Sequence, residues 1–119
     1  MSDLQRSEAF YVGLLGLPVV RRWNDDRGAP RSSWVQLEGE RFLALERGST
    51  ERRPVDEEVG HHALALRIEA ADRAAWARHL ESAGVIIERR TAYSLFFRDP
   101  DGALLAVSHY PDPVEPADL

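Results

Sequence analysis

The sequence predicts an α+β fold made of two βαβββ modules, with the opening strand of module one missing. Three observations predict it. A chain of 119 residues is long enough for one domain with a single core. The expected elements run helix, three strands, linker, strand, helix, three strands. The element ends also match, Leu15-Gly16 with Ala83-Gly84 and Leu43-Ala44-Leu45 with Leu105-Ala106-Val107.

Module one is expected over residues 1–47. A helix should run from Asp3 to Gly16, with Ser2 or Asp3 as its N-cap and Gly16 in the C′ position, and Pro18 should enforce its end. Strands are expected at 19–23, 34–37 and 41–46, with a loop of turn-forming residues at 24–33. In that loop, Asp25-Asp26 is interpreted as solvated charge.

A polar linker at 48–60 separates the modules within the single domain 1–119, module two is expected over 61–110, and an acidic, loose tail over 111–119. Strands are expected at 61–68, 85–89, 93–98 and 104–110, with a helix at 72–83. Trp76, Leu80 and Ala83 should form the apolar stripe of that helix. The turn Asp99-Pro100-Asp101-Gly102 should join the last two strands.

Composition excludes several classes of function. The net charge is -5, all 15 basic residues are arginine, and no basic stretch is present, so nucleic acid is not expected as a partner. The absence of cysteine removes disulfides, thiolate metal sites and thiol nucleophiles. We find no membrane-spanning run and no signal-peptide pattern, and therefore expect a cytoplasmic protein.

The segments AFYVGLLGL and FFRDPDGALLAVSHYP, together with the repeat, resemble the vicinal oxygen chelate superfamily. This superfamily includes glyoxalase I, extradiol dioxygenases, fosfomycin-resistance enzymes and bleomycin-resistance binding proteins. The resemblance implies a cupped sheet around a cavity and a homodimer. In the enzymes of the family, up to four His, Gln or Glu side chains on the concave face hold a divalent metal.

The resemblance places Ala44, Ala63 and Ala106 at three of the metal positions, and the fourth would lie before Met1. A methyl group cannot coordinate a metal, so we expect no metal site and no cofactor. An alternative stays open, in which His61, Glu46 and a residue of the missing strand hold a metal. His79 and His109 are interpreted as packing or surface residues.

Strand alternation suggests a ligand-binding set on the same face. Its members are Trp34, Gln36, Phe42, Arg67, Tyr93, Ser108 and Tyr110, with Phe96 in place of Tyr93 if the register differs. Aromatic rings, a few polar groups and one arginine suit a small planar or anionic ligand. The leading hypothesis is a metal-independent protein that binds a small organic molecule. The alternatives are a divalent-metal-dependent lyase or dioxygenase with a non-standard site, and a degenerate module that serves only in assembly.

Overall fold

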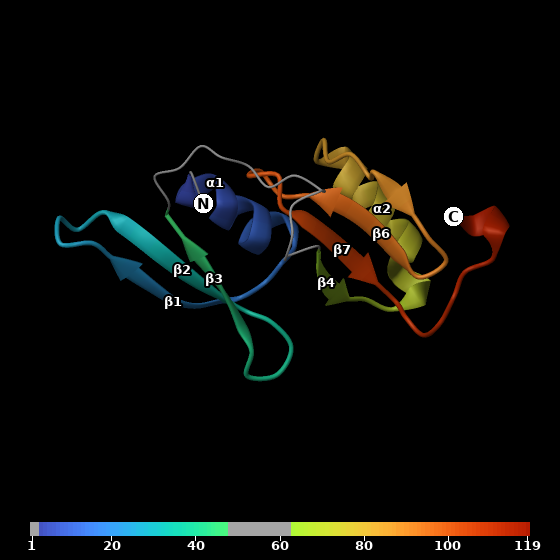
Figure 1. Ribbon diagram of the computed structural model, residues 1–119, viewed down its shortest axis with the longest axis horizontal. Helices are drawn as coiled ribbons and strands as arrows, with labels where there is room; N and C mark the ends of the chain where they lie inside the picture. Colours follow the sequence, from blue (N-terminus) through green and yellow to red (C-terminus); the bar gives the residue numbers. More distant parts are fainter. Residues whose placement is uncertain (1–2, 48–62) are drawn as a thin grey trace. The chain divides into compact units, whose positions relative to one another are not determined.

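The computed structural model describes residues 3–47 and 63–119 (Figure 1). The chain divides into two compact units, Met1–Arg53 and Pro54–Leu119, and each is described by itself. The first contains a helix and a three-stranded sheet, the second a helix and a four-stranded sheet, which confirms the predicted α+β class. The linker expected at 48–60, together with His61 and His62, lies outside the described residues.

The first unit begins with the helix that the sequence predicts. It consists of α1 (Leu4–Glu8), continued by the wider, π-helical turn η1 (Ala9–Leu14). The Asp3 carboxylate caps it by accepting a hydrogen bond from the backbone N–H of Arg6 at 3.0 Å. Gly16 ends it with a φ of 77°, a left-handed conformation that glycine adopts at little cost. Both predicted ends of the helix are therefore confirmed.

The sheet of the first unit is antiparallel in the order β1-β2-β3. Its strands are β1 (Val19–Asn24), β2 (Pro30–Gln36) and β3 (Phe42–Glu46). The predicted loop at 24–33 was too long, because β2 already begins at Pro30. The buried apolar residues of this unit come from the helix and from the centre of the sheet: Leu4, Phe10, Tyr11, Leu15, Val35 and Leu45.

Two hairpins, one in each unit, use the same turn chemistry. The leading aspartates, Asp25 and Asp99, each accept two backbone N–H groups at 2.8 to 3.0 Å. The glycine three positions later takes a positive φ, 80° at Gly28 and 88° at Gly102. The interpretation of Asp25 as solvated charge was wrong, because its carboxylate closes the β1–β2 hairpin.

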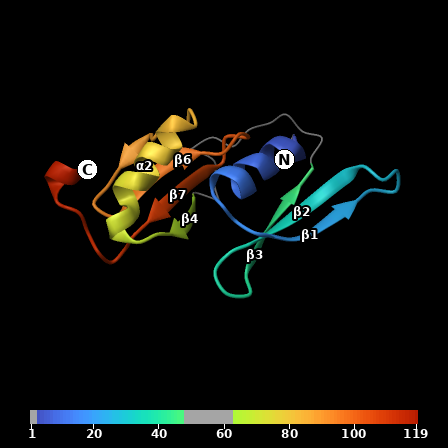
Figure 2. The ribbon, with the colours of Figure 1, turned by 180° about the vertical axis from the view of Figure 1, so that it is seen from behind.

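The sheet of the second unit has the order β4-β7-β6-β5, with β4 parallel to β7 and the other neighbours antiparallel. Figure 2 shows it from behind. The elements of this unit are β4 (Leu64–Arg67), η2 (Ala70–Asp72), α2 (Arg73–Ser82), β5 (Arg89–Arg90), β6 (Ser94–Arg98), β7 (Leu104–Ser108) and η3 (Pro116–Asp118). Beyond β7 the chain stays bonded to this unit, because the N–H of Val114 donates to the carbonyl of Ala92 at 2.8 Å.

Two predicted details of the second unit were wrong. The strand expected at 85–89 is reduced to Arg89 and Arg90, because Gly84 and the bond from Val85 N–H to the Leu80 carbonyl at 3.0 Å still belong to the helix end. The buried stripe of α2 is Arg73, Ala77 and Leu80, while Trp76 is half-buried and Ala83 is exposed. The sheet contributes a buried face to the core of this unit: Leu95, Phe97, Leu105 and Val107.

Candidate functional site

An aromatic surface lies on one face of the first sheet, with one exposed ring and two half-buried rings. The strand register sets Trp34 opposite Ala44 and Gln36 opposite Phe42, so these side chains share a face. The rings of Trp34 and Phe42 stack at 4.4 Å with an interplanar angle of 16°. Trp23 on β1 continues the surface, with its ring 5.5 Å from that of Trp34. We call Trp23, Trp34 and Phe42 the aromatic face.

Sequence reasoning missed Trp23, although the alternation of the β1 strand could have indicated it. The guanidinium of Arg21 lies 3.7 Å above the Trp23 ring, a cation–π contact on the same face. Phe42 is 47% exposed at the other end of the aromatic face. An aromatic ring left open to this extent, with a second ring stacked on it, can extend the stack with a planar ligand.

The other predicted ligand-binding residues lie in the second unit. Arg67 on β4 is opposite Ser108 on β7, whose hydroxyl is 2.9 Å from that of Ser94. Tyr93 and Tyr110 flank the strand ends with their rings 5.1 Å apart, and both are exposed.

Phe96, which was considered in place of Tyr93, is opposite Ala106 on β7. The guanidinium of Arg89 covers the Phe96 ring at 4.5 Å from its centre, so the ring already has a cationic partner within its own sheet.

The residues at the expected metal positions do not fit a metal ion. Ala44 is exposed on β3 and Ala63 is exposed just before β4, while Ala106 on β7 is 2% exposed. None carries a ligand atom. Across residues 3–47 and 63–119, the structure contains no group of three or more His, Asp or Glu side chains able to hold a metal.

His109 lies in the interior of the second unit and is 3% exposed. Its Nε2 atom is 3.0 Å from Nη1 of Arg73. Because a guanidinium can only donate, Nε2 accepts, and Nδ1 carries the proton that it donates to the carbonyl of Asp112. Burial and the nearby Arg90 guanidinium lower the pKa of Arg73. This arrangement gives His109 a structural role between α2 and the segment after β7.

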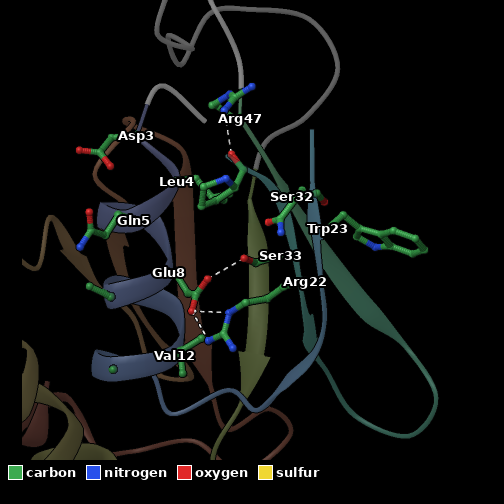
Figure 3. Close-up of a pocket in the computed structure, with 14 residues that line it drawn as sticks. Asp3, Leu4, Gln5, Glu8, Val12, Arg22, Trp23, Ser32, Ser33 and Arg47 are labelled. Carbon is green, nitrogen blue, oxygen red and sulfur yellow. Dashed lines mark hydrogen bonds and ion pairs between the residues drawn. The ribbon is translucent and has the colours of Figure 1, made fainter. Parts of the chain in front are cut away.

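A second candidate site lies in the first unit, in a groove between the helix and the sheet (Figure 3). Its volume is about 960 Å³. We call it the α1 groove; it is lined by Asp3, Leu4, Gln5, Glu8, Ala9, Val12, Gly13, Arg22, Trp23, Asn24, Pro30, Ser32, Ser33 and Arg47. None of the seven predicted ligand-binding residues is among those that line it.

Glu8 is at the centre of the α1 groove and connects three elements. Its Oε1 accepts from Nε of Arg22 at 3.0 Å and also from Nη2, while its Oε2 accepts from the Ser33 hydroxyl at 2.6 Å. These interactions hold the pKa of Glu8 below its usual value, mainly through the hydrogen bond from Arg22 and against the effect of partial burial. Strand alternation in the sequence could have indicated this cluster, because it places Arg22 and Ser33 on the other face of the sheet from Trp34 and Phe42.

The repeat, the parallel β4–β7 pair and an open sheet face define a protein of the two-module βαβββ class. The sequence model of the Glyoxalase/Bleomycin resistance protein/Dioxygenase superfamily matches residues 1–107, and the chain belongs to this family. The resemblance predicted from the sequence is thereby confirmed. A search of curated proteins gave no match. Among the residues that the structure describes, no helix combines the length and apolar character needed to cross a membrane.

Solved structures share the fold at low sequence identity. A glyoxalase/dioxygenase from Nostoc punctiforme is 19% identical with a TM-score of 0.74, and the match covers 97% of this chain and 86% of that protein's chain. A manganese-bound mutant of the fosfomycin resistance protein FosX from Listeria monocytogenes is 16% identical with a TM-score of 0.72, covering 92% and 85%. Lactoylglutathione lyase from Agrobacterium tumefaciens is 21% identical with a TM-score of 0.66, covering 90% and 85%.

Proposed function

We propose that the protein binds a small planar organic molecule on its aromatic face, without a metal ion. The observation that carries this proposal is the stacked pair Trp34 and Phe42, open to solvent at Phe42 and extended on the other side by Trp23. Offset or stacked aromatic contacts contribute about 0.5–1.5 kcal/mol beyond the area that they bury. A ligand with one planar ring system would therefore gain most by stacking on Phe42.

A polar group beside the rings adds a means of orienting the ligand. Gln36 is the cross-strand neighbour of Phe42, and its Nε2 donates to the carbonyl of Gly39 at 3.1 Å. This bond fixes the amide so that its oxygen can accept a hydrogen bond from a ligand N–H or O–H. Ala44 on the same face supports binding without a metal, because its methyl group offers contact area and no ligand atom.

Tryptophan fluorescence tests the proposal in a Trp76→Phe background, which removes the emission of α2 and leaves Trp23 and Trp34. Naphthalene-2-carboxylate and 2-naphthylamine are the planar probes, and cyclohexanecarboxylate is the non-planar control. We expect the planar probes alone to quench saturably, and Phe42→Ala to weaken their binding about threefold to tenfold. Ile86→Ala, at an exposed position of the second unit, is the matched control. Equal affinity in Phe42→Ala would refute stacking on this face.

A metal-dependent lyase or dioxygenase remains the second candidate, since Glu46 lies two positions after Ala44 on β3 and on the same face. Its Oε1 accepts from the Ser32 hydroxyl at 3.1 Å. Calorimetric titration with Mn²⁺, Ni²⁺, Zn²⁺ and Fe²⁺ separates the candidates. Tight binding of about one equivalent that is lost in Glu46→Gln or His61→Ala would favour the enzyme. The homodimer and the cytoplasmic location remain predictions; light scattering after size exclusion tests the first.

A further inference from the structure

Two arginines that line the α1 groove are more exposed than the half-buried carboxylates with which they pair. The side chain of Arg22 is 60% exposed, while that of its partner Glu8 is 23% exposed. Arg47 repeats this arrangement, with its side chain 42% exposed above Asp25 at 24%. At these two pairs an approaching molecule meets the guanidinium group before the carboxylate. The carboxylate of Asp3, which also lines the groove, is engaged by the backbone N–H of Arg6. An anionic group on a ligand would complement this surface.

Part of the groove wall is apolar. Leu4, Ala9 and Val12 line it from the helical segment, and Pro30 lines it from β2. In Figure 3, Arg22 reaches across from β1 to Glu8, while Leu4 lies towards one end of the groove and Val12 towards the other. An elongated apolar chain could therefore lie along the helix with its charged end at Arg22.

Gly13 is a second, independent sign that this space is kept open. It lies within η1, has no positive φ, and a Cβ built on it meets no atom within 4 Å. Neither backbone conformation nor crowding therefore requires glycine, although glycine in a helix costs about 1 kcal/mol relative to alanine. Gly13 lines the α1 groove, and any larger side chain there would narrow it.

We propose that the α1 groove binds a small organic acid with an apolar chain, its carboxylate at Arg22 and its chain along the helical segment. Arg22 Nε and Nη2 hold Glu8. In the proposed complex, Nη1 would donate to the carboxylate of the ligand. Of the aromatic face, Trp23 also lines the groove, whereas Trp34 and Phe42 do not. Arg22 and Ser33 alternate with Trp23 and Trp34 along β1 and β2, so the proposed carboxylate contact lies on the face of the sheet opposite to Trp34 and Phe42.

Octanoate is the probe, with octylamine, octanol and acetate as its matched controls for charge and chain. Titrations followed by ¹H–¹⁵N NMR spectra should give shifts at residues 4–13, 22–24 and 30–33 with octanoate, at an affinity at least tenfold above those of the other three. Equal binding of octylamine would overturn the anionic assignment. Equal binding of acetate would overturn the role of the apolar wall.

Four variants locate the site. Arg22→Gln should weaken octanoate at least tenfold. Arg22→Lys should weaken it less than Arg22→Gln, because it keeps the charge but has a single nitrogen for both Glu8 and the ligand. Arg78→Gln, at an exposed arginine of α2, should change nothing. Gly13→Leu should melt no lower than the wild type and also lose at least tenfold in affinity. If it unfolds, Ala9→Leu makes the same test from the neighbouring turn. Unchanged octanoate binding in both Arg22→Gln and the folded wall variant would overturn the proposal.

The test is independent of the one for the aromatic face. Phe42→Ala should leave octanoate binding within twofold of the wild type, since Phe42 is not among the residues that line the α1 groove. A tenfold loss in that variant would instead assign octanoate to the aromatic face and overturn the groove. Failure of the stacking proposal would leave this result unaffected.

Discussion

Single arginine residues connect the elements of this protein, and the chain uses arginine as its only strong base. Arg47 shows why the choice matters: one Nη donates to the carbonyl of Pro30 at 2.8 Å and the other to Asp25 at 2.9 Å. Arg98 likewise reaches both Glu88 and the carbonyl of Gly102. A lysine amine has a single nitrogen and could not span such pairs in fixed geometry.

The ion pair of Glu8 should be visible in the pH dependence of stability. The pKa of Glu8 is lowered in the folded protein, so its charge stabilises the fold above the unfolded value, near 4.3, and this part is lost as the pH falls through the folded pKa. Because Arg22 is largely exposed, Glu8→Gln should cost only about 0.5–1 kcal/mol at pH 7.

Urea denaturation at several pH values measures this difference between Glu8→Gln and the wild type. We expect the gap to narrow as the pH falls below the unfolded value and through the lowered folded pKa of Glu8, because a protonated carboxyl and an amide are nearly equivalent. Glu40→Gln, at an exposed carboxylate of the β2–β3 turn, provides the control. A gap that stays constant with pH would show that the effect of Glu8 is not electrostatic.

At the scale of helices and strands, the sequence predicts those features that depend on residues close together in the chain. Asp3 and Gly16 delimit the first helix as predicted, because capping depends on residues within one turn. The strand expected at 85–89 is reduced to Arg89 and Arg90, because the end of the α2 helix, and not the apolar run, determines the backbone at Gly84 and Val85. The α1 groove was not predictable in this way, since Glu8 meets Arg22 and Ser33 from positions 14 and 25 residues away.

Two glycines should respond to the same substitution with opposite sign. Gly13→Ala should raise the free energy of unfolding by about 0.5–1 kcal/mol, because Gly13 is helical and a Cβ there meets open space. Gly84→Ala should lower it by about 1 kcal/mol, because Gly84 ends α2 with a φ of 82°. Urea denaturation of both variants measures the two effects. A loss of stability in Gly13→Ala would mean that the helical segment needs glycine for a reason other than an open groove.

At the scale of the whole molecule, each unit has a buried core of its own. The repeat was predictable because the pairing of β6 with β7 and of β2 with β3 follows from hairpins of similar sequence. Among the described residues β7 also has β4 as a parallel neighbour, whereas β3, its counterpart in the repeat, pairs with β2 alone. The two units therefore differ in how many strands support the core.

This difference predicts that the units lose their structure separately when one core is damaged. Leu45 is fully buried in the first unit, and Leu45→Ala should cost about 3 kcal/mol there. Hydrogen exchange under native conditions should then accelerate in amides of residues 19–46, with those of 94–108 nearly unchanged. Leu95→Ala, equally buried in the second unit, is the matched variant and should give the reverse pattern. Equal acceleration of exchange in both regions, in either variant, would show instead that the two cores unfold as one cooperative unit. In that case no strand of the first sheet could open alone.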